Sequence, residues 1–154
     1  MATNARTIVF PNTTREIEED AITRASPRSV VLNEGLERLG AKETRDGWEY
    51  EGRAFSETAI ESVRLPSTLK RIEAEAFYQC DNLQTVEIPN GVEHIGKTCF
   101  SSSKIEEITL PGTLREINED AFKYCWSLKT VWAEEGCALD VRKYAKNGIE
   151  VRRK

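Results

Sequence analysis

Histidine and cysteine, which often carry out catalysis or bind metal ions, are few in this chain. His94 is the one histidine, and no Ser-His-Asp or Cys-His set can be assembled without a second candidate base. The cysteines lack the paired CxxC spacing of a zinc site and are scattered at Cys80, Cys99, Cys125 and Cys137. We therefore expect no enzymatic activity, no metal site and no cofactor, and we expect His94 to be a surface residue.

Two further kinds of site can be tested on the sequence. A phosphate-binding loop would need a glycine-rich segment, which the chain lacks. A calcium loop would need spaced oxygen ligands and a glycine, and the acidic run of Glu16, Glu18, Glu19 and Asp20 has neither. We expect this run to be a solvated face beside a first helical turn.

The overall charge excludes several classes of partner. The 154 residues include 26 acidic and 22 basic side chains, for a net charge of −4. Such a balance lacks the basic field that nucleic acid or an anionic membrane requires. No window approaches the roughly 20 apolar residues of a membrane span, and the first residues show no secretory signal. We expect no nucleic-acid partner and no membrane insertion, with a cytoplasmic location by default and a cell-surface location if the chain is a fragment of an exported protein.

An internal repeat predicts the elements that position these side chains. Segments beginning at Ile60, Leu83 and Ile105 share the same order of apolar residues, a proline, a second apolar group and a phenylalanine. The prolines stand at 66, 89 and 111 and the phenylalanines at 77, 100 and 122, so the period is 23 and then 22 residues. Weaker copies precede and follow these three, as terminal repeats usually do, which gives about six rungs.

Each repeat predicts a short strand and a return of the chain over a shared core. In Val63-x-Leu65 apolar and polar residues alternate, which is typical of a strand with one buried face. The proline that follows ends the strand because it cannot donate to a ladder. Phe77 and its counterparts then close the far side from a short helical turn. One rung cannot bury these residues alone, so the sequence predicts a β-rich repeat solenoid forming a single domain, 1–154.

The repeats resemble the BspA-type leucine-rich repeats, whose units carry a proline after the strand and an Ala-Phe-x-x-Cys element. This element stands at 76–80 and at 121–125, whereas the middle copy has Cys99 before Phe100 and Ser103 in the cysteine position. The resemblance implies a leucine-rich-repeat fold with short strands on a concave face and short helical turns on the convex side. It also implies a relationship to surface antigens and adhesins of host-associated bacteria and protist parasites.

Stacking of the rungs places equivalent residues in columns about 4.8 Å apart. Cys80 and Cys125 are two rungs apart, a separation of about 10 Å that exceeds the reach of a disulfide. We interpret both as small buried side chains, in preference to a redox or metal role. One solvent column alternates in sign, and we expect its members to pair across neighbouring rungs: Arg15, Glu37, Lys70, Glu93 and Arg115.

The outward face of the strands differs from that paired column. Its central positions are Val9, Val31, Arg64, Glu87, Thr109 and Trp132. By the family resemblance this is the concave, partner-binding face, with one Arg64–Glu87 pair and apolar ends. Trp132 either contacts a partner, as exposed tryptophans often do, or packs under the C-terminal segment as part of a cap.

An insertion interrupts the second repeat at 41–53. Between Leu39 and Phe55 lie 15 residues, where regular rungs have four. Asp46-Gly47 is a good two-residue turn, so we expect 42–45 and 48–51 to pair as a small ribbon. Trp48 and Tyr50 on this ribbon either contact a partner or fold back onto the solenoid.

The ends of the chain differ in how they are covered. The segment 133–154 is predicted to be a C-terminal cap, whereas nothing precedes the first rung that could act as one. We expect a fragment of a longer repeat protein, or self-association through the N-terminal rung. The leading hypothesis is a scaffold that binds a protein partner, of unknown identity, through Arg64, Glu87, Thr109 and Trp132, with Trp48 and Tyr50 on the insertion. The alternative is a fragment of a cell-surface adhesin or antigen.

Overall fold

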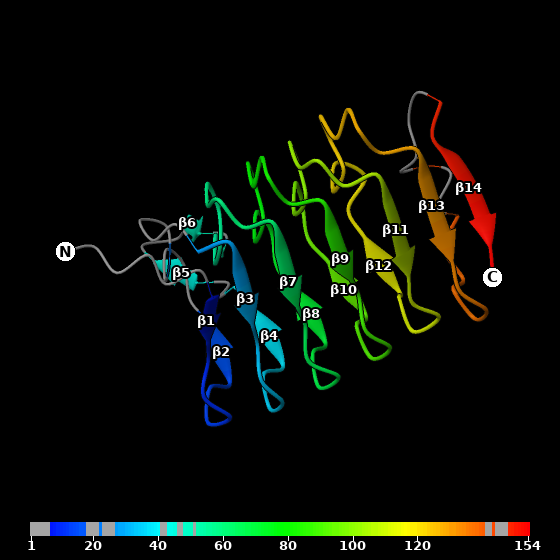
Figure 1. The fold of residues 1–154 in the computed structure, drawn as a ribbon. Helices are drawn as coiled ribbons and strands as arrows, with labels where there is room; N and C mark the ends of the chain where they lie inside the picture. The colour runs from blue at the N-terminus through cyan, green and yellow to red at the C-terminus, as the bar shows by residue number, and fades with distance from the viewer. Residues whose placement is uncertain are drawn as a thin grey trace.

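The chain winds into a solenoid of parallel strands with about five turns (Figure 1). The computed structural model describes residues 7–17, 22, 27–40, 43–45, 48–50, 52–140, 143 and 148–154. Within these residues no α-helix occurs. Strands β1 (Thr7–Val9) and β14 (Glu150–Arg153) lie at opposite ends of the stack.

The predicted strands form one row along the solenoid, which we call the first row. Between β1 and β14 it contains β3 (Ser29–Val31), β7 (Ser62–Arg64), β9 (Thr85–Glu87), β11 (Glu107–Leu110) and β13 (Thr130–Ala133). All pairs are parallel, and the register places Val63 beside Val86 and Ile108 beside Val131. The row divides into two sheets, β1-β3-β7-β9 and β11-β13-β14, which meet between β9 and β11. The predicted stacking of successive rungs is confirmed.

A second row of strands lies where the sequence analysis expected only a return of the chain. It consists of β2 (Glu16–Ile17), β4 (Arg38–Leu39), β8 (Arg71–Ile72), β10 (His94–Ile95) and β12 (Glu116–Ile117), paired in parallel as one sheet. In each strand the second residue is buried and the first faces outward. Two residues are too few for a pattern of alternation to show, so the sequence alone gave no sign of this sheet.

Phenylalanines fill the side of the core opposite the first row. The rings of Phe55, Phe77, Phe100 and Phe122 stack at centroid distances of 5.6, 5.5 and 5.8 Å, with interplanar angles of 18° or less. The segments that carry them are hydrogen-bonded turns and not the short helical turns that were expected. Each contains a residue with positive φ two positions after the phenylalanine, which ends any helical turn there: Glu57, Gln79, Ser102 and Tyr124.

The cysteines belong to columns of small buried side chains. Cys80 and Cys125 share a column with Thr58 and Ser103, and each thiol donates to a phenylalanine carbonyl oxygen, at 3.0 Å to Phe55 and 2.9 Å to Phe100. Cys99 takes the alanine position before Phe100. All four cysteines are free and buried, and burial raises the pKa of Cys80, Cys99 and Cys125. The interpretation of Cys80 and Cys125 as packing residues is confirmed.

Threonine hydroxyls link alternate turns between the two rows. The Thr68 hydroxyl donates to the Leu36 carbonyl oxygen at 2.8 Å and accepts from the Gly35 backbone N–H at 2.9 Å. Thr113 repeats both bonds to Val92 and Gly91, at 2.9 Å each. These hydroxyls satisfy backbone groups that the short turns leave unpaired, and so they tie the rungs that carry Thr68 and Thr113 to the rungs before them.

The insertion and the C-terminal segment add the remaining strands. β5 (Glu43–Arg45) pairs with β6 (Trp48–Tyr50) in antiparallel register, which is the ribbon that the Asp46-Gly47 turn predicts. β14 pairs with β13, and Leu139, Ile149 and Val151 pack against the core. Val141 and Tyr144 were also expected to cover the last rung, but they lie outside the described residues.

Candidate functional site

A groove runs along the outward face of the first row. It consists of two hollows that share four residues, and the larger has a volume of about 570 Å³. We call it the sheet-face groove. It spans the junction between β9 and β11, and its walls come from five strands or the turns that follow them. The lining residues are Val63, Arg64, Leu65, Thr85, Val86, Glu87, Ile88, Pro89, Asn90, Glu107, Ile108, Thr109, Trp132, Glu134 and Lys154.

Four of the six predicted partner-binding residues line this groove. Parallel register places Arg64 beside Glu87 and Thr109 beside Trp132. Arg64 and Glu87 are exposed, and Thr109 and Trp132 are half-buried. The expected Arg64–Glu87 pair does not form an ion pair, because no contact within 4.0 Å joins these two described side chains, and both residues are exposed. Both charges are therefore available to a ligand.

Trp132 is held from several sides by its own chain. The Arg152 guanidinium lies 5.2 Å from the ring centroid and the Lys154 ammonium 5.1 Å, distances typical of cation–π contacts. The indole N–H donates to a Glu107 carboxylate oxygen at 3.2 Å. Lys154 also donates to the Thr109 hydroxyl at 3.3 Å. Trp132 thus contacts the cap strand β14, as one of the two predicted alternatives has it, and it also lines the groove.

In the larger hollow of the groove, which Trp132 lines, carboxylates outnumber basic side chains. Glu87, Glu107 and Glu134 line the larger hollow, and Lys154 is its one basic residue. Neither Glu87 nor Glu134 is ion-paired with any residue that the structure describes. Glu87 is exposed and Glu134 is half-buried, so solvent reaches both carboxylates. This part of the groove can accept hydrogen bonds and positive charge.

Trp48 and Tyr50 are the other two predicted partner-binding residues. They lie at the two ends of β6 in the hairpin, and their side chains are outside the described part of the chain. The hairpin contacts that were predicted for them remain a proposal.

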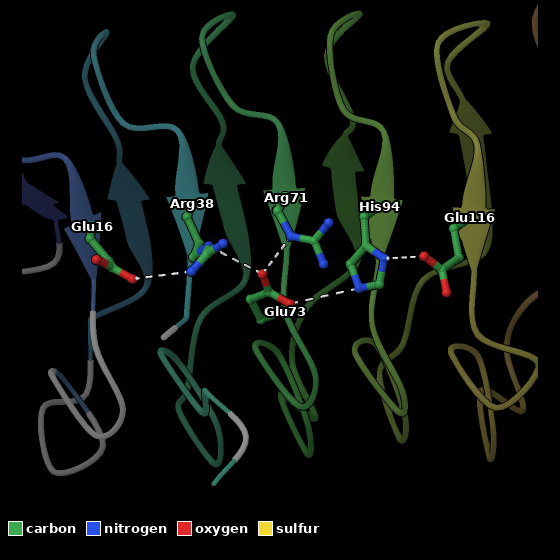
Figure 2. A network of polar contacts seen from close by, with 6 residues as sticks. All are labelled: Glu16, Arg38, Arg71, Glu73, His94 and Glu116. Atoms are coloured by element: carbon green, nitrogen blue, oxygen red, sulfur yellow. Dashed lines mark hydrogen bonds and ion pairs between the residues drawn. The ribbon is translucent and has the colours of Figure 1, made fainter. Parts of the chain in front are cut away.

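A polar cluster that was not predicted from the sequence lies on the second row, centred on a buried carboxylate (Figure 2). The side chain of Glu73 is 8% exposed, and it contacts Arg71 at 2.8 Å, Arg38 at 3.3 Å and His94 at 3.7 Å. The other imidazole nitrogen of His94 lies 3.0 Å from a Glu116 carboxylate oxygen. Arg38 also reaches Glu16 at 3.8 Å. We call these six residues the Glu73 cluster.

Two glycines allow the neighbouring rungs to approach the backbone at Glu73 closely. Gly40 and Gly96 occupy the position of Glu73 in the neighbouring rungs. A Cβ at Gly40 would lie 2.5 Å from the Gly52 carbonyl oxygen and 3.2 Å from the Glu73 Cβ, and one at Gly96 would lie 2.3 Å from the Ala74 nitrogen. A repeat with glycine, a charged residue and glycine at successive equivalent positions is the sequence signal that could have revealed the cluster.

The Glu73 cluster corrects two expectations about charge. His94 was expected to be a surface residue, yet its side chain is only 16% exposed and contacts two carboxylates. The alternating column Arg15, Glu37, Lys70, Glu93 and Arg115 was expected to pair across rungs, yet no ion pair joins any of these five described side chains. Ion pairs form instead between the residues that follow this column by one position, because the strand register holds those side chains side by side. The residues of the alternating column precede the strands and are exposed.

The described residues contain no group of three or more side chains placed to hold a metal ion. In the same part of the chain, no helix is long and apolar enough to cross a bilayer. The His94 imidazole has carboxylates on both sides and no serine or cysteine nucleophile in the Glu73 cluster. The cluster therefore has the composition of a structural ion-pair network.

The comparison with known families decides the classification. Six copies of the BspA type leucine-rich repeat region match residues 49–145. The chain belongs to this family. The match agrees with the resemblance seen in the repeats, and it includes the whole sheet-face groove up to β13.

Solved structures show the same fold. A leucine-rich repeat protein of T. pallidum is 21% identical, with a TM-score of 0.74 over 97% of this chain and 74% of that chain. A leucine-rich cell surface protein of Faecalibacterium prausnitzii A2-165 is 20% identical (TM-score 0.70; 94% of this chain, 35% of that one). The pneumococcal vaccine antigen PcpA is 19% identical (TM-score 0.69; 98% and 42%). The comparison with curated proteins gives no significant match.

Proposed function

We propose that the chain is a non-enzymatic module that binds a protein partner through the sheet-face groove. The observation that carries the proposal is the convergence of Arg64, Glu87, Thr109 and Trp132 on one continuous groove of a rigid sheet. Trp48 and Tyr50 on the hairpin are proposed as a second contact. Family membership supports an interaction role, since stacked repeats create extended surfaces of the kind that bind other proteins.

Trp132 is the residue on which partner binding should depend most. Tryptophan is enriched among the few interface residues that dominate affinity, and its ring is already fixed by Arg152, Lys154 and Glu107. A ring held in place loses little side-chain freedom when a partner covers it. The groove thus offers a preorganised aromatic contact with charged neighbours.

The test is a pull-down from the native source with matched tryptophan variants. Trp126 is the control because it is 84% exposed and lies outside the groove. Partners should be retained by W126A and lost with W132A. Equal retention by both variants would contradict the proposal, and an enzymatic activity abolished by H94Q would contradict its non-enzymatic part.

A second proposal concerns where the module works. The resemblance to a leucine-rich cell surface protein and to a pneumococcal antigen favours a segment of a surface adhesin or antigen. This chain spans 35% and 42% of those two chains. Antibody labelling of intact cells of the native source tests it. Labelling only after the cells are permeabilised would contradict surface display.

Self-association through the first rung is a further part of the proposal. The outer edge of β1 is unpaired within the described residues, and Val9 on it is 62% exposed. An exposed strand edge with apolar side chains is a template for pairing with another chain. Light scattering should therefore show a dimer that V9K dissociates, and a monomer at all concentrations would contradict it.

A further inference from the structure

The chain places one of its own lysines in the sheet-face groove. Lys154 follows β14, and its ammonium lies 5.1 Å from the Trp132 ring centroid and 3.3 Å from the Thr109 hydroxyl. An aromatic face together with a hydroxyl acceptor is a favourable environment for an ammonium group. The structure thus shows that this end of the groove accepts a lysine side chain.

Lys154 makes no ion pair with the groove carboxylates among the described residues. Glu107 accepts a hydrogen bond from the Trp132 indole, whereas Glu87 and Glu134 make no ion pair with the described residues. The larger hollow therefore carries three carboxylates and one ammonium. A ligand that complements it must bring positive charge.

We propose that the partner presents an extended segment bearing lysine or arginine, and that one of its basic side chains displaces Lys154 from Trp132. This inference rests on the proposed function and specifies the chemistry of the partner. An acidic partner would instead meet Glu87, Glu107 and Glu134 in the same hollow, and like charges brought together in this way oppose binding.

The test uses a fluorescein-labelled peptide of alternating lysine and threonine, with one of alternating glutamate and threonine as its counterpart. Fluorescence anisotropy should show saturable binding of the lysine peptide that weakens with added salt, and no binding of the glutamate peptide. E87Q and E134Q should each weaken binding about threefold. Glu93 and Glu135 lie outside the groove, so E93Q and E135Q are matched controls that should leave affinity unchanged.

Displacement of Lys154 can be tested separately, through the effect of K154Q on peptide affinity. K154Q removes the competing ammonium and should strengthen binding of the lysine peptide about threefold. Arg153 lies outside the groove and donates to the Cys137 carbonyl oxygen, so R153Q should have no such effect. Equal strengthening by K154Q and R153Q would show that only net charge matters, and would overturn the displacement.

The proposed function and this inference fail in different ways. If pulled-down partners depend on Trp132 but the lysine peptide does not bind, or the glutamate peptide binds as tightly, this inference is overturned and the proposed function stands. If the partners do not depend on Trp132, the proposed function is overturned whatever the peptides do.

Discussion

The two rows of strands use charged residues in opposite ways. On the second row, Arg38, Arg71 and His94 gather around the buried carboxylate of Glu73, so its charges are already neutralised within the chain. On the first row, Glu87 is exposed and unpaired within the described residues, although the strands are stacked in the same parallel way. The stacking of the strands therefore does not by itself decide whether a charged side chain stabilises the fold or remains free for a ligand.

A substitution in the core that both rows share should cause the largest loss in the free energy of unfolding. Phe100 stacks on Phe77 and Phe122 and is fully buried. F100A should lower the free energy of unfolding by about 3–5 kcal/mol, because it removes a large side chain and leaves a cavity. Chemical denaturation monitored by circular dichroism measures this. A loss below about 1 kcal/mol would mean that the stacked ring does not hold the rungs together.

The sharpest contrast lies between Glu73 and Glu87. E73Q should lower the free energy of unfolding by about 1–3 kcal/mol, since it leaves Arg38 and Arg71 without their carboxylate. E87Q should change it by less than about 0.5 kcal/mol, because no described residue pairs with Glu87. Denaturation of the two variants side by side checks both values. Equal losses would remove the distinction between the rows.

The junction of the rows should show an intermediate effect. Thr113 bonds to the Val92 carbonyl and the Gly91 N–H, so T113V should lower the free energy of unfolding by about 0.5–1.5 kcal/mol. Hydrogen exchange should become faster at Gly91 in particular. Exchange at Gly91 as slow as in the unaltered protein would show that the hydroxyl does not bridge the rungs.

The parts of the structure that could be predicted from the sequence are those whose residue pattern recurs from rung to rung. The first row and the buried cysteines were predictable, because Val63, Val86 and Ile108 recur in one column with polar residues on either side. The second row was not, since strands of two residues are too short to alternate. The alignment of the repeats was enough to predict that one face carries Arg64, Glu87, Thr109 and Trp132. The Glu73 cluster takes side chains from five rungs: Glu73 belongs to one column, and its partners lie in the column before it, at Glu16, Arg38, Arg71, His94 and Glu116.

The smallest effect is expected at a fully exposed ion pair between rungs. Lys129 donates to Glu106 at 2.8 Å; this hydrogen bond and the charge attraction lower the pKa of Glu106 and raise that of Lys129. A carboxyl group whose pKa is lowered by folding stabilises the folded chain at pH values above its ordinary pKa. That stabilisation is lost as the pH falls through the lowered pKa. K129Q should return the pKa of Glu106 toward its ordinary value in an NMR titration, with little change in stability. An unchanged titration would show that the pair does not form in solution.

Hydrogen exchange of the chain, measured with and without its bound protein partner, tests whether the sheet-face groove is the binding surface. We expect the partner to slow exchange in β7, β9, β11 and β13, where the groove lies, and to leave β4, β8 and β10 beside the Glu73 cluster unchanged. Slower exchange confined to β4, β8 and β10, with the groove strands unaffected, would contradict it.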